Sequence, residues 1–230
     1  MKTVVVGGNS RNIGKTSVMT GLIRALRSLD WTAVKITQYG HGICSRNGQP
    51  CGCKPKEHPF VLSEENDLHG LADTCRFLAA GARRSLWLRV RQGQLGEAYP
   101  LLERAIRDDP FVIIESNSVL AYLQPSLYLV VLNTSKNDFK SSCRQFLDHS
   151  SALVTVQEGI DVQKWSAFDR RRLQNKPVFP VTTRNYFSDD LCSFVSGRLS
   201  NSAAREAAFR DHRRDGPKVG GDFVPDFHSH

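Results

Sequence analysis

The sequence predicts an α/β protein with a mostly parallel β-sheet flanked by helices. Short apolar, β-branched segments, typical of buried strands, alternate with longer segments that carry an apolar face at helical spacing. The first strand, helix and strand follow one another within the first 37 residues, and such a crossover makes the two strands parallel. With 230 residues, 40% of them hydrophobic, the chain can bury a large core.

The expected elements follow from these two periodicities. The opening unit is a buried strand at 3–6, a helix at 15–29 and a second strand at 32–37. The further strands are expected at 86–90, 111–115, 127–132, 152–156 and 177–182, and the further helices at 72–82, 95–107, 139–147, 162–173 and 191–213. Ligands in such sheets bind at the carboxyl ends of the strands, so functional residues are expected there.

Two segments interrupt the alternation. Residues 38–63 form a long connection rich in glycine, proline and cysteine, and residues 214–230 contain glycines and prolines with little periodicity. We therefore predict one domain over 1–213, with a Cys-rich insertion loop at 38–63, followed by a flexible C-terminal tail at 214–230.

The stretch "GGNSRNIGKTSV", from Gly7 to Val18, lies between the first strand and the first helix. It is close to the phosphate-binding pattern G-x-x-x-x-G-K-[ST], but the first glycine stands at Gly8, one place before its usual position, which Asn9 occupies. In such a loop, backbone N–H groups and a helix N-terminus point at phosphates. The order of strand, loop and helix disfavours the alternative, a chance Gly-Lys-Thr at a helix start.

This phosphate loop predicts a nucleotide site with bound Mg²⁺. Lys15 is expected to reach the outer phosphates as a catalytic residue, and the Thr16 hydroxyl to hold the metal. The expected nucleotide-binding residues are Gly8, Asn9, Ser10, Arg11, Asn12, Ile13, Gly14, Lys15, Thr16 and Ser17.

Several stretches together carry a resemblance to known families. The spacing from Gly8 to Gly14 is similar to that of dethiobiotin synthetase and cobyrinic acid diamide synthase. The stretches "IRALRSLDWTAVKITQYGHG", "DTCRFLAAGA" and "FVIIESN" resemble molybdopterin-guanine dinucleotide biosynthesis protein B, with Ser116 in place of a glycine. The resemblance covers about residues 1–183. It implies a three-layer P-loop NTPase fold, of the branch that includes the nickel-insertion GTPases of hydrogenase and urease.

Three further side chains are candidates for the same site. Glu115 ends the apolar strand "FVIIE", where a Mg²⁺ ligand or a water-positioning carboxylate is expected, and Asp73 is a candidate for a further carboxylate near the metal. Lys35 ends another strand and is expected to contact phosphate or an anionic second substrate as a catalytic residue. The alternatives are a solvated strand-end glutamate, an aspartate favoured at a helix N-terminus and an edge-exposed lysine.

The choice between ATP and GTP stays open. "SKND" at 135–138 follows a strand and is similar to the guanine-reading N/T-K-x-D motif. In the branch resembled here, however, that motif follows the next strand, where this chain has "QEGID" at 157–161 without an Asn-Lys pair.

The insertion loop contains "HGICSRNGQPCGC", which offers His41, Cys44, Cys51 and Cys53 as four ligands for tetrahedral zinc. The spacing is not the familiar C-x-x-C, and His58 competes as the fourth ligand. Free thiols in a mobile loop, or a redox pair formed by the last two cysteines, are the alternatives.

The composition of the chain restricts the kinds of partner that we expect. No apolar run reaches the roughly 18 residues of a membrane span, and the start of the chain does not resemble a signal peptide, so we expect a cytoplasmic protein with no membrane partner. The net charge of +8 is spread over the chain without an aromatic-interleaved basic strip, which disfavours a nucleic-acid partner.

Three functions are compatible with these patterns. The first is an Mg-dependent nucleoside triphosphatase that hydrolyses ATP or GTP or transfers the γ-phosphate to a small anionic second substrate, in cofactor biosynthesis as the resemblance implies. The second is a nucleotide-switched metal-delivery protein that uses the cysteine loop and a partner enzyme or a homodimer interface. The third is a nucleotide-binding adaptor without catalysis.

Overall fold

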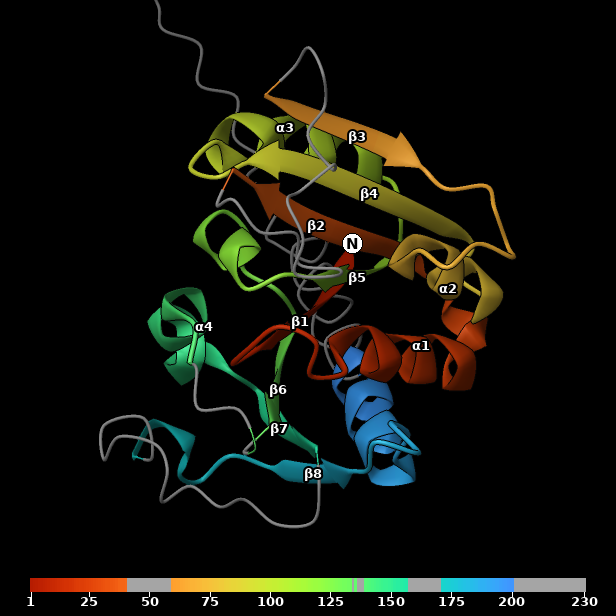
Figure 1. The fold of residues 1–230 in the computed structure, drawn as a ribbon. Helices are drawn as coiled ribbons and strands as arrows, with labels where there is room; N and C mark the ends of the chain where they lie inside the picture. The colour runs from red at the N-terminus through yellow and green to blue at the C-terminus, as the bar shows by residue number, and fades with distance from the viewer. Residues whose placement is uncertain (41–58, 134, 136–138, 157–170, 201–230) are drawn as a thin grey trace, which may run out of the picture.

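A computed structural model describes residues 1–40, 59–133, 135, 139–156 and 171–200 (Figure 1). Its centre is an eight-stranded sheet with the order β3-β4-β2-β5-β1-β6-β7-β8. Every neighbouring pair is parallel except β3 and β4, which pair antiparallel. The predicted fold class, a mostly parallel sheet flanked by helices, is confirmed.

The elements alternate along the chain as the periodicities predict. The strands are β1 (Lys2–Gly8), β2 (Thr32–Tyr39), β3 (Phe60–Glu64), β4 (Arg84–Arg91), β5 (Phe111–Glu115), β6 (Leu127–Asn133), β7 (Ala152–Val156) and β8 (Val178–Val181). The α-helices are α1 (Lys15–Ala25), α2 (Asp73–Ala79), α3 (Leu95–Ile106) and α4 (Ser141–Phe146), and a last helix is described over residues 189–200. Short 3₁₀ turns lie at Arg27–Leu29, Ser118–Ala121 and Leu147–His149.

Two hydrophobic layers, one on each face of the sheet, form the core. On one face, alternate residues of β1, such as Val4 and Val6, pack with α1, α2 and the helix at 189–200. On the other face, Val5 packs in a cluster with α3 and α4. Strands that are buried on both faces read as continuous apolar runs, which is why β1, β5 and β6 were recognisable from sequence.

The structure corrects some predicted boundaries. The connection was predicted at 38–63. In the structure, β2 extends to Tyr39 and β3 begins at Phe60, so the connection between these two strands is residues 40–59. β3 was not predicted; it is a short edge strand with no fully buried residue, so its alternation is weak. The last helix begins at 189 and continues through Gly197 to residue 200. The tail at 214–230 and the helix predicted at 162–173, up to residue 170, lie outside the described residues.

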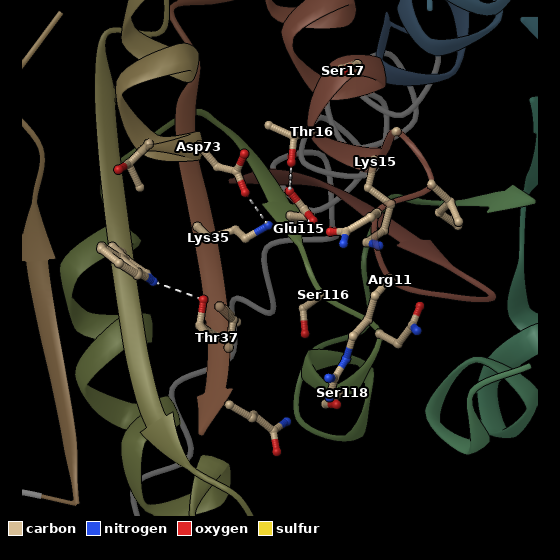
Figure 2. Close-up of a pocket in the computed structure, with 18 of the residues that line it drawn as sticks. Arg11, Lys15, Thr16, Ser17, Lys35, Thr37, Asp73, Glu115, Ser116 and Ser118 are labelled. Carbon is tan, nitrogen blue, oxygen red and sulfur yellow. Dashed lines mark hydrogen bonds and ion pairs between the residues drawn. The ribbon is translucent and has the colours of Figure 1, made fainter. Parts of the chain in front are cut away.

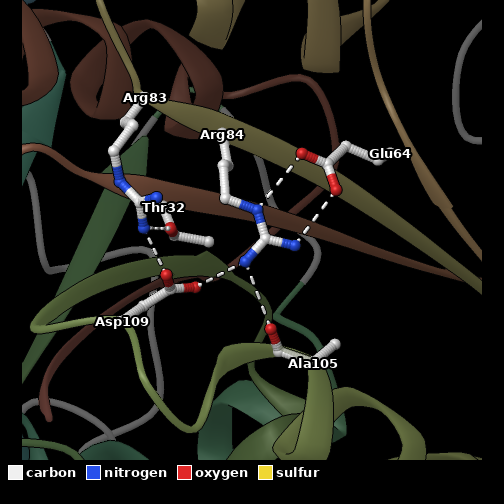
Figure 3. Close-up of polar contacts among 6 residues, drawn as sticks. All are labelled: Thr32, Glu64, Arg83, Arg84, Ala105 and Asp109. Carbon is white, nitrogen blue, oxygen red and sulfur yellow. Dashed lines mark hydrogen bonds and ion pairs between the residues drawn. The ribbon is translucent and has the colours of Figure 1, made fainter.

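A network of ion pairs lies at the edge of the sheet where β4 and β5 begin (Figure 3). Asp109, buried in the turn between α3 and β5, pairs with Arg83 and, at 3.1 Å, with Arg84. Arg84 also makes two bonds, of 3.1 and 3.0 Å, to the Glu64 carboxylate of β3. This network joins β3, β4 and the turn before β5 at the edge of the sheet opposite the carboxyl ends of the parallel strands.

Candidate nucleotide site

The phosphate loop connects β1 to α1, and its second glycine has a backbone that requires glycine. Gly14 has φ 95°, in the left-handed region, immediately before the first turn of α1. A Cβ on Gly14 would also lie 2.0 Å from the ring of Tyr186, which belongs to the segment after β8. The close approach of this ring was not predictable from the motif.

The displaced glycine has a packing reason. A Cβ on Gly8 would lie 2.8 Å from the backbone oxygen of Val131 in β6, so this position tolerates only glycine. Asn9 stands where the usual pattern has its glycine, and its side chain pairs with the end of β6. Asn9 Oδ1 accepts from the Asn133 N–H at 3.0 Å, and Asn9 Nδ2 donates to the Asn133 carbonyl at 3.3 Å. The side-chain amide thus ties the loop to the neighbouring strand.

Asn117, which was not predicted from the sequence, bonds to the backbone of Gly8 at the start of the phosphate loop. Its Oδ1 accepts from the Gly8 N–H at 2.9 Å, and its Nδ2 donates to the Gly8 carbonyl at 3.0 Å. The Tyr128 hydroxyl donates to the same Oδ1 at 3.1 Å. Burial raises the pKa of Tyr128 well above its usual value, so this hydroxyl keeps its proton. The loop entrance is therefore fixed by side chains that follow or belong to β5 and β6.

Four predicted residues meet at the foot of the loop (Figure 2). The Thr16 hydroxyl donates to Glu115 Oε2 at 2.7 Å, and Lys35 Nζ lies 2.6 Å from Glu115 Oε1. The same ammonium lies 2.9 Å from Asp73 Oδ2. β5 supplies the glutamate, β2 the lysine and the start of α2 the aspartate. The structure thus brings together residues that are separated by up to a hundred positions in the sequence.

The charges in this group stabilise one another. Burial acts to lower the pKa of Lys35, but the Glu115 and Asp73 carboxylates outweigh it, so the pKa is raised. Burial acts to raise the pKa of Asp73, but Lys35 outweighs it, so that pKa is lowered. Both groups are held in their charged forms. Neither the edge-exposed lysine nor the merely dipole-stabilised aspartate describes these geometries.

Lys15 is in a different situation. Its ammonium donates to the Ser10 carbonyl across the loop at 2.9 Å, and burial lowers its pKa. A partly buried lysine that bonds to a neutral carbonyl gains strongly from an anion beside it.

A pocket of about 980 Å³ opens over these residues at the carboxyl edge of the sheet. Its described lining contains five basic side chains and two acidic ones, so the pocket favours an anion. One end is lined by the loop from Arg11 to Ser17, together with Lys140. The other end extends past Lys35 along β2 and β4 to Thr37 and Trp87, and the indole donates to the Thr37 hydroxyl at 3.0 Å.

The donor set at the foot of the loop suits Mg²⁺. A threonine hydroxyl and two carboxylates are hard oxygen ligands, and Mg²⁺ is usually held by one or two carboxylates with phosphates and waters. The Lys35 ammonium between the two carboxylates shows that they already converge on a cation. Among the described residues, no group of three or more His, Cys, Asp and Glu residues gathers as a metal cluster. The predicted zinc ligands His41, Cys44, Cys51 and Cys53 lie outside the described residues.

The base-reading segments are also largely outside the described residues. Only residue 135 of the "SKND" segment is described, and residues 157–161 are not. The choice between ATP and GTP therefore stays a prediction without a structural answer. No helix within the described ranges is long and apolar enough to cross a membrane.

The chain has a three-layer architecture, with helices on both faces of a mostly parallel sheet and the phosphate-loop motif between β1 and α1. No family model matches the chain, and no curated protein matches it.

Among solved structures, the chain is similar to hydrogenase maturation factor HypB from Archaeoglobus fulgidus, with 13% identity, 86% of this chain and 90% of that chain covered, and a TM-score of 0.49. It is also similar to HypB from Helicobacter pylori in complex with nickel, with 14% identity, 86% and 87% covered, and a TM-score of 0.48. The MobB protein homolog from Bacillus stearothermophilus has 13% identity, 87% and 99% covered, and a TM-score of 0.40.

Proposed function

We propose that the chain binds a nucleoside triphosphate with Mg²⁺ in the phosphate loop and cleaves its γ-phosphate. One observation carries the proposal: Thr16, Glu115, Lys35 and Asp73 converge within hydrogen-bonding distance directly below the loop. A loop of this shape at a helix N-terminus provides main-chain donors for phosphates, and the group below it provides ligands for the metal.

Each side chain has a distinct part in the proposed reaction. Lys15 exchanges its carbonyl partner for phosphate oxygens and stabilises the charge that develops on them. Thr16 and Glu115 would hold the metal, and Asp73, at the start of α2, would be a further carboxylate beside it. A bound Mg²⁺ would supply positive charge that neutralises the phosphates. Lys35 is already anchored by both carboxylates, so its remaining proton can point at an incoming oxygen.

The acceptor of the phosphoryl group is water or a second substrate. Beyond Lys35, the pocket is also lined by Thr37, Gln38, Trp87 and Gln92. These residues provide uncharged polar groups and the aromatic ring of Trp87 near Lys35. We place the second substrate there, with an anionic group facing Lys35.

The metal-delivery hypothesis and the adaptor hypothesis remain alternatives. Metal delivery depends on the cysteine loop, and the adaptor hypothesis on weak turnover at an otherwise intact loop. Cofactor biosynthesis, a partner enzyme and a homodimer likewise stay hypotheses that rest on the sequence resemblance.

A thermal-shift panel tests nucleotide binding. A ligand present at 100 times its Kd stabilises the folded state by about 2.7 kcal/mol, which corresponds to roughly 5–10 °C for a chain of this size. We expect such a rise with Mg-ATP or Mg-GTP, and no rise in Lys15→Ala. EDTA should reduce the effect. An identical response of wild type and Lys15→Ala to every triphosphate would remove the basis of the proposed site.

A further inference from the structure

Lys140 is a cation of the pocket that the phosphate-loop motif does not include. It lies between β6 and α4, and its half-buried side chain lines the pocket beside the loop. Its backbone N–H donates to the Asn9 carbonyl at 2.7 Å, which fixes this lysine to the phosphate loop itself. Lys35 enters from β2, on the opposite side of β1 in the sheet.

Among the described residues, no carboxylate forms an ion pair with the Lys140 ammonium, whereas the Lys35 ammonium pairs with two. Burial, together with the neighbouring Lys15 and Arg11, lowers the pKa of Lys140 to about 8, against a weaker opposing effect of Glu115. Lys35 also acts to lower it. A lysine placed among other cations is costly unless an anion joins them.

The neighbours of Lys140 indicate where that anion lies. The ammonium interacts electrostatically both with Lys15 in the loop and with the pair of Glu115 and Lys35 below it. Main-chain amides of a phosphate loop hold the inner phosphates, and the metal ligands and the loop lysine stand at the outer ones. Lys140 lines the same pocket as Lys15, Lys35 and Glu115, so its ammonium can reach the outer end of a bound polyphosphate.

We infer that Lys140 binds the terminal phosphate of the nucleotide, so that this lysine and Lys35 grip the transferred group from opposite sides. The inference rests on the proposed function and names a positioning residue outside the sequence motif. It also makes binding depend on pH, because only the ammonium form attracts phosphate. The bound phosphate raises the pKa of Lys140, so affinity is greatest below pH 8 and falls as the pH rises above 8, where binding must take up a proton.

The experiment compares imido analogues of ATP and GTP with ADP and GDP, each with Mg²⁺, by titration calorimetry between pH 7 and pH 9.5. A lost charge-assisted hydrogen bond weakens binding by about tenfold to a hundredfold. We expect Lys140→Met to lose this factor for the triphosphate analogue and much less for the diphosphate. Lys140→Arg should keep the affinity and bind without the fall above pH 8. Lys15 is retained in both variants, so any remaining pH dependence reports on Lys15.

Lys176→Met is the matched control. Lys176 also has a pKa lowered by burial, but it bonds to the carbonyls of Asp148 and Ser150 outside the pocket, so its removal should leave affinity and pH profile unchanged. Equal loss of di- and triphosphate in Lys140→Met, or a pH profile identical to that of wild type, overturns the inference. If Lys140→Met fails to fold, an unaltered fall in Lys140→Arg overturns it instead. If the wild-type protein binds no nucleotide, the proposed function itself has failed.

Discussion

The substitution Lys35→Met tests how much the ion pairs of Lys35 with Glu115 and Asp73 stabilise the fold. The substitution keeps a side chain of similar length but removes the ammonium that lies 2.6 Å from Glu115 and 2.9 Å from Asp73. Glu115 is buried, with a side-chain exposure of 6%, so its charge loses its ion-pair partner, while the Thr16 hydroxyl still donates to it. Breaking a buried pair costs 3–5 kcal/mol. Asp73 is more exposed, which favours the lower end of this range.

A loss of about 3 kcal/mol corresponds to a fall in Tm of roughly 6–12 °C in a domain of this size. Thermal unfolding followed by circular dichroism, without nucleotide, measures the fall. Millimolar Mg²⁺ should restore part of the Tm in Lys35→Met and have less effect on wild type, because the two carboxylates then lack their internal cation. Lys176→Met should change the Tm much less.

The pH dependence of stability provides a second test of the same group. The pKa of Asp73 is lowered by folding, so its contribution is present above the unfolded value near 3.8 and is lost as the pH falls through the folded value. The pKa of Lys35 is raised by folding, so its contribution is present below 10.5 and is lost as the pH rises through the folded value. In Lys35→Met, the fall in stability at low pH and the fall at high pH should both be smaller than in wild type. A variant that melts with wild type at every pH would refute the reasoning.

Three further predictions concern other parts of the chain. Asn9→Gly restores the usual motif but removes two hydrogen bonds to Asn133, so we expect weaker nucleotide binding by calorimetry and a lower Tm; equal or tighter binding would contradict the role of this side chain. Asp109→Asn should lower the Tm by roughly 5 °C or more, because two arginines lose their shared partner, whereas exposed Asp108→Asn should not. Anaerobically purified protein should contain about one zinc per chain or per dimer, and Cys51→Ser should contain less; metal analysis that finds none would reject the zinc site.

The sequence predicted the parts of the site that depend on short-range pattern. Gly14, Lys15 and Thr16 are defined by the motif, and Glu115 and Lys35 were recognisable because a charged residue ended or interrupted an apolar strand. Parallel strands present their carboxyl ends on one edge of the sheet, so residues at those ends were expected to meet. In the structure, Glu115 lies 2.7 Å from the Thr16 hydroxyl and 2.6 Å from the Lys35 ammonium, although Lys35 stands in the middle of β2 and not at its end.

The rest could not be predicted because it depends on strand order. Asn117 and Lys140 become neighbours of the loop only when β5 and β6 take places on either side of β1. An asparagine after a strand and a lysine before a short helix are common, and nothing in their local sequence marks them. β3 was missed for a related reason. It is stabilised by its antiparallel pairing with β4, and its own five residues do not show the pattern of a buried strand.

The packing of Tyr186 on Gly14 has a consequence for biosynthesis. The phosphate loop lies near the beginning of the chain, yet one wall of its pocket comes from the segment after the last strand. A ribosome that has released β1 to β7 has therefore made every residue of the loop motif without the aromatic ring that covers it. We expect a nascent chain to retain nucleotide only after residue 186 has left the exit tunnel.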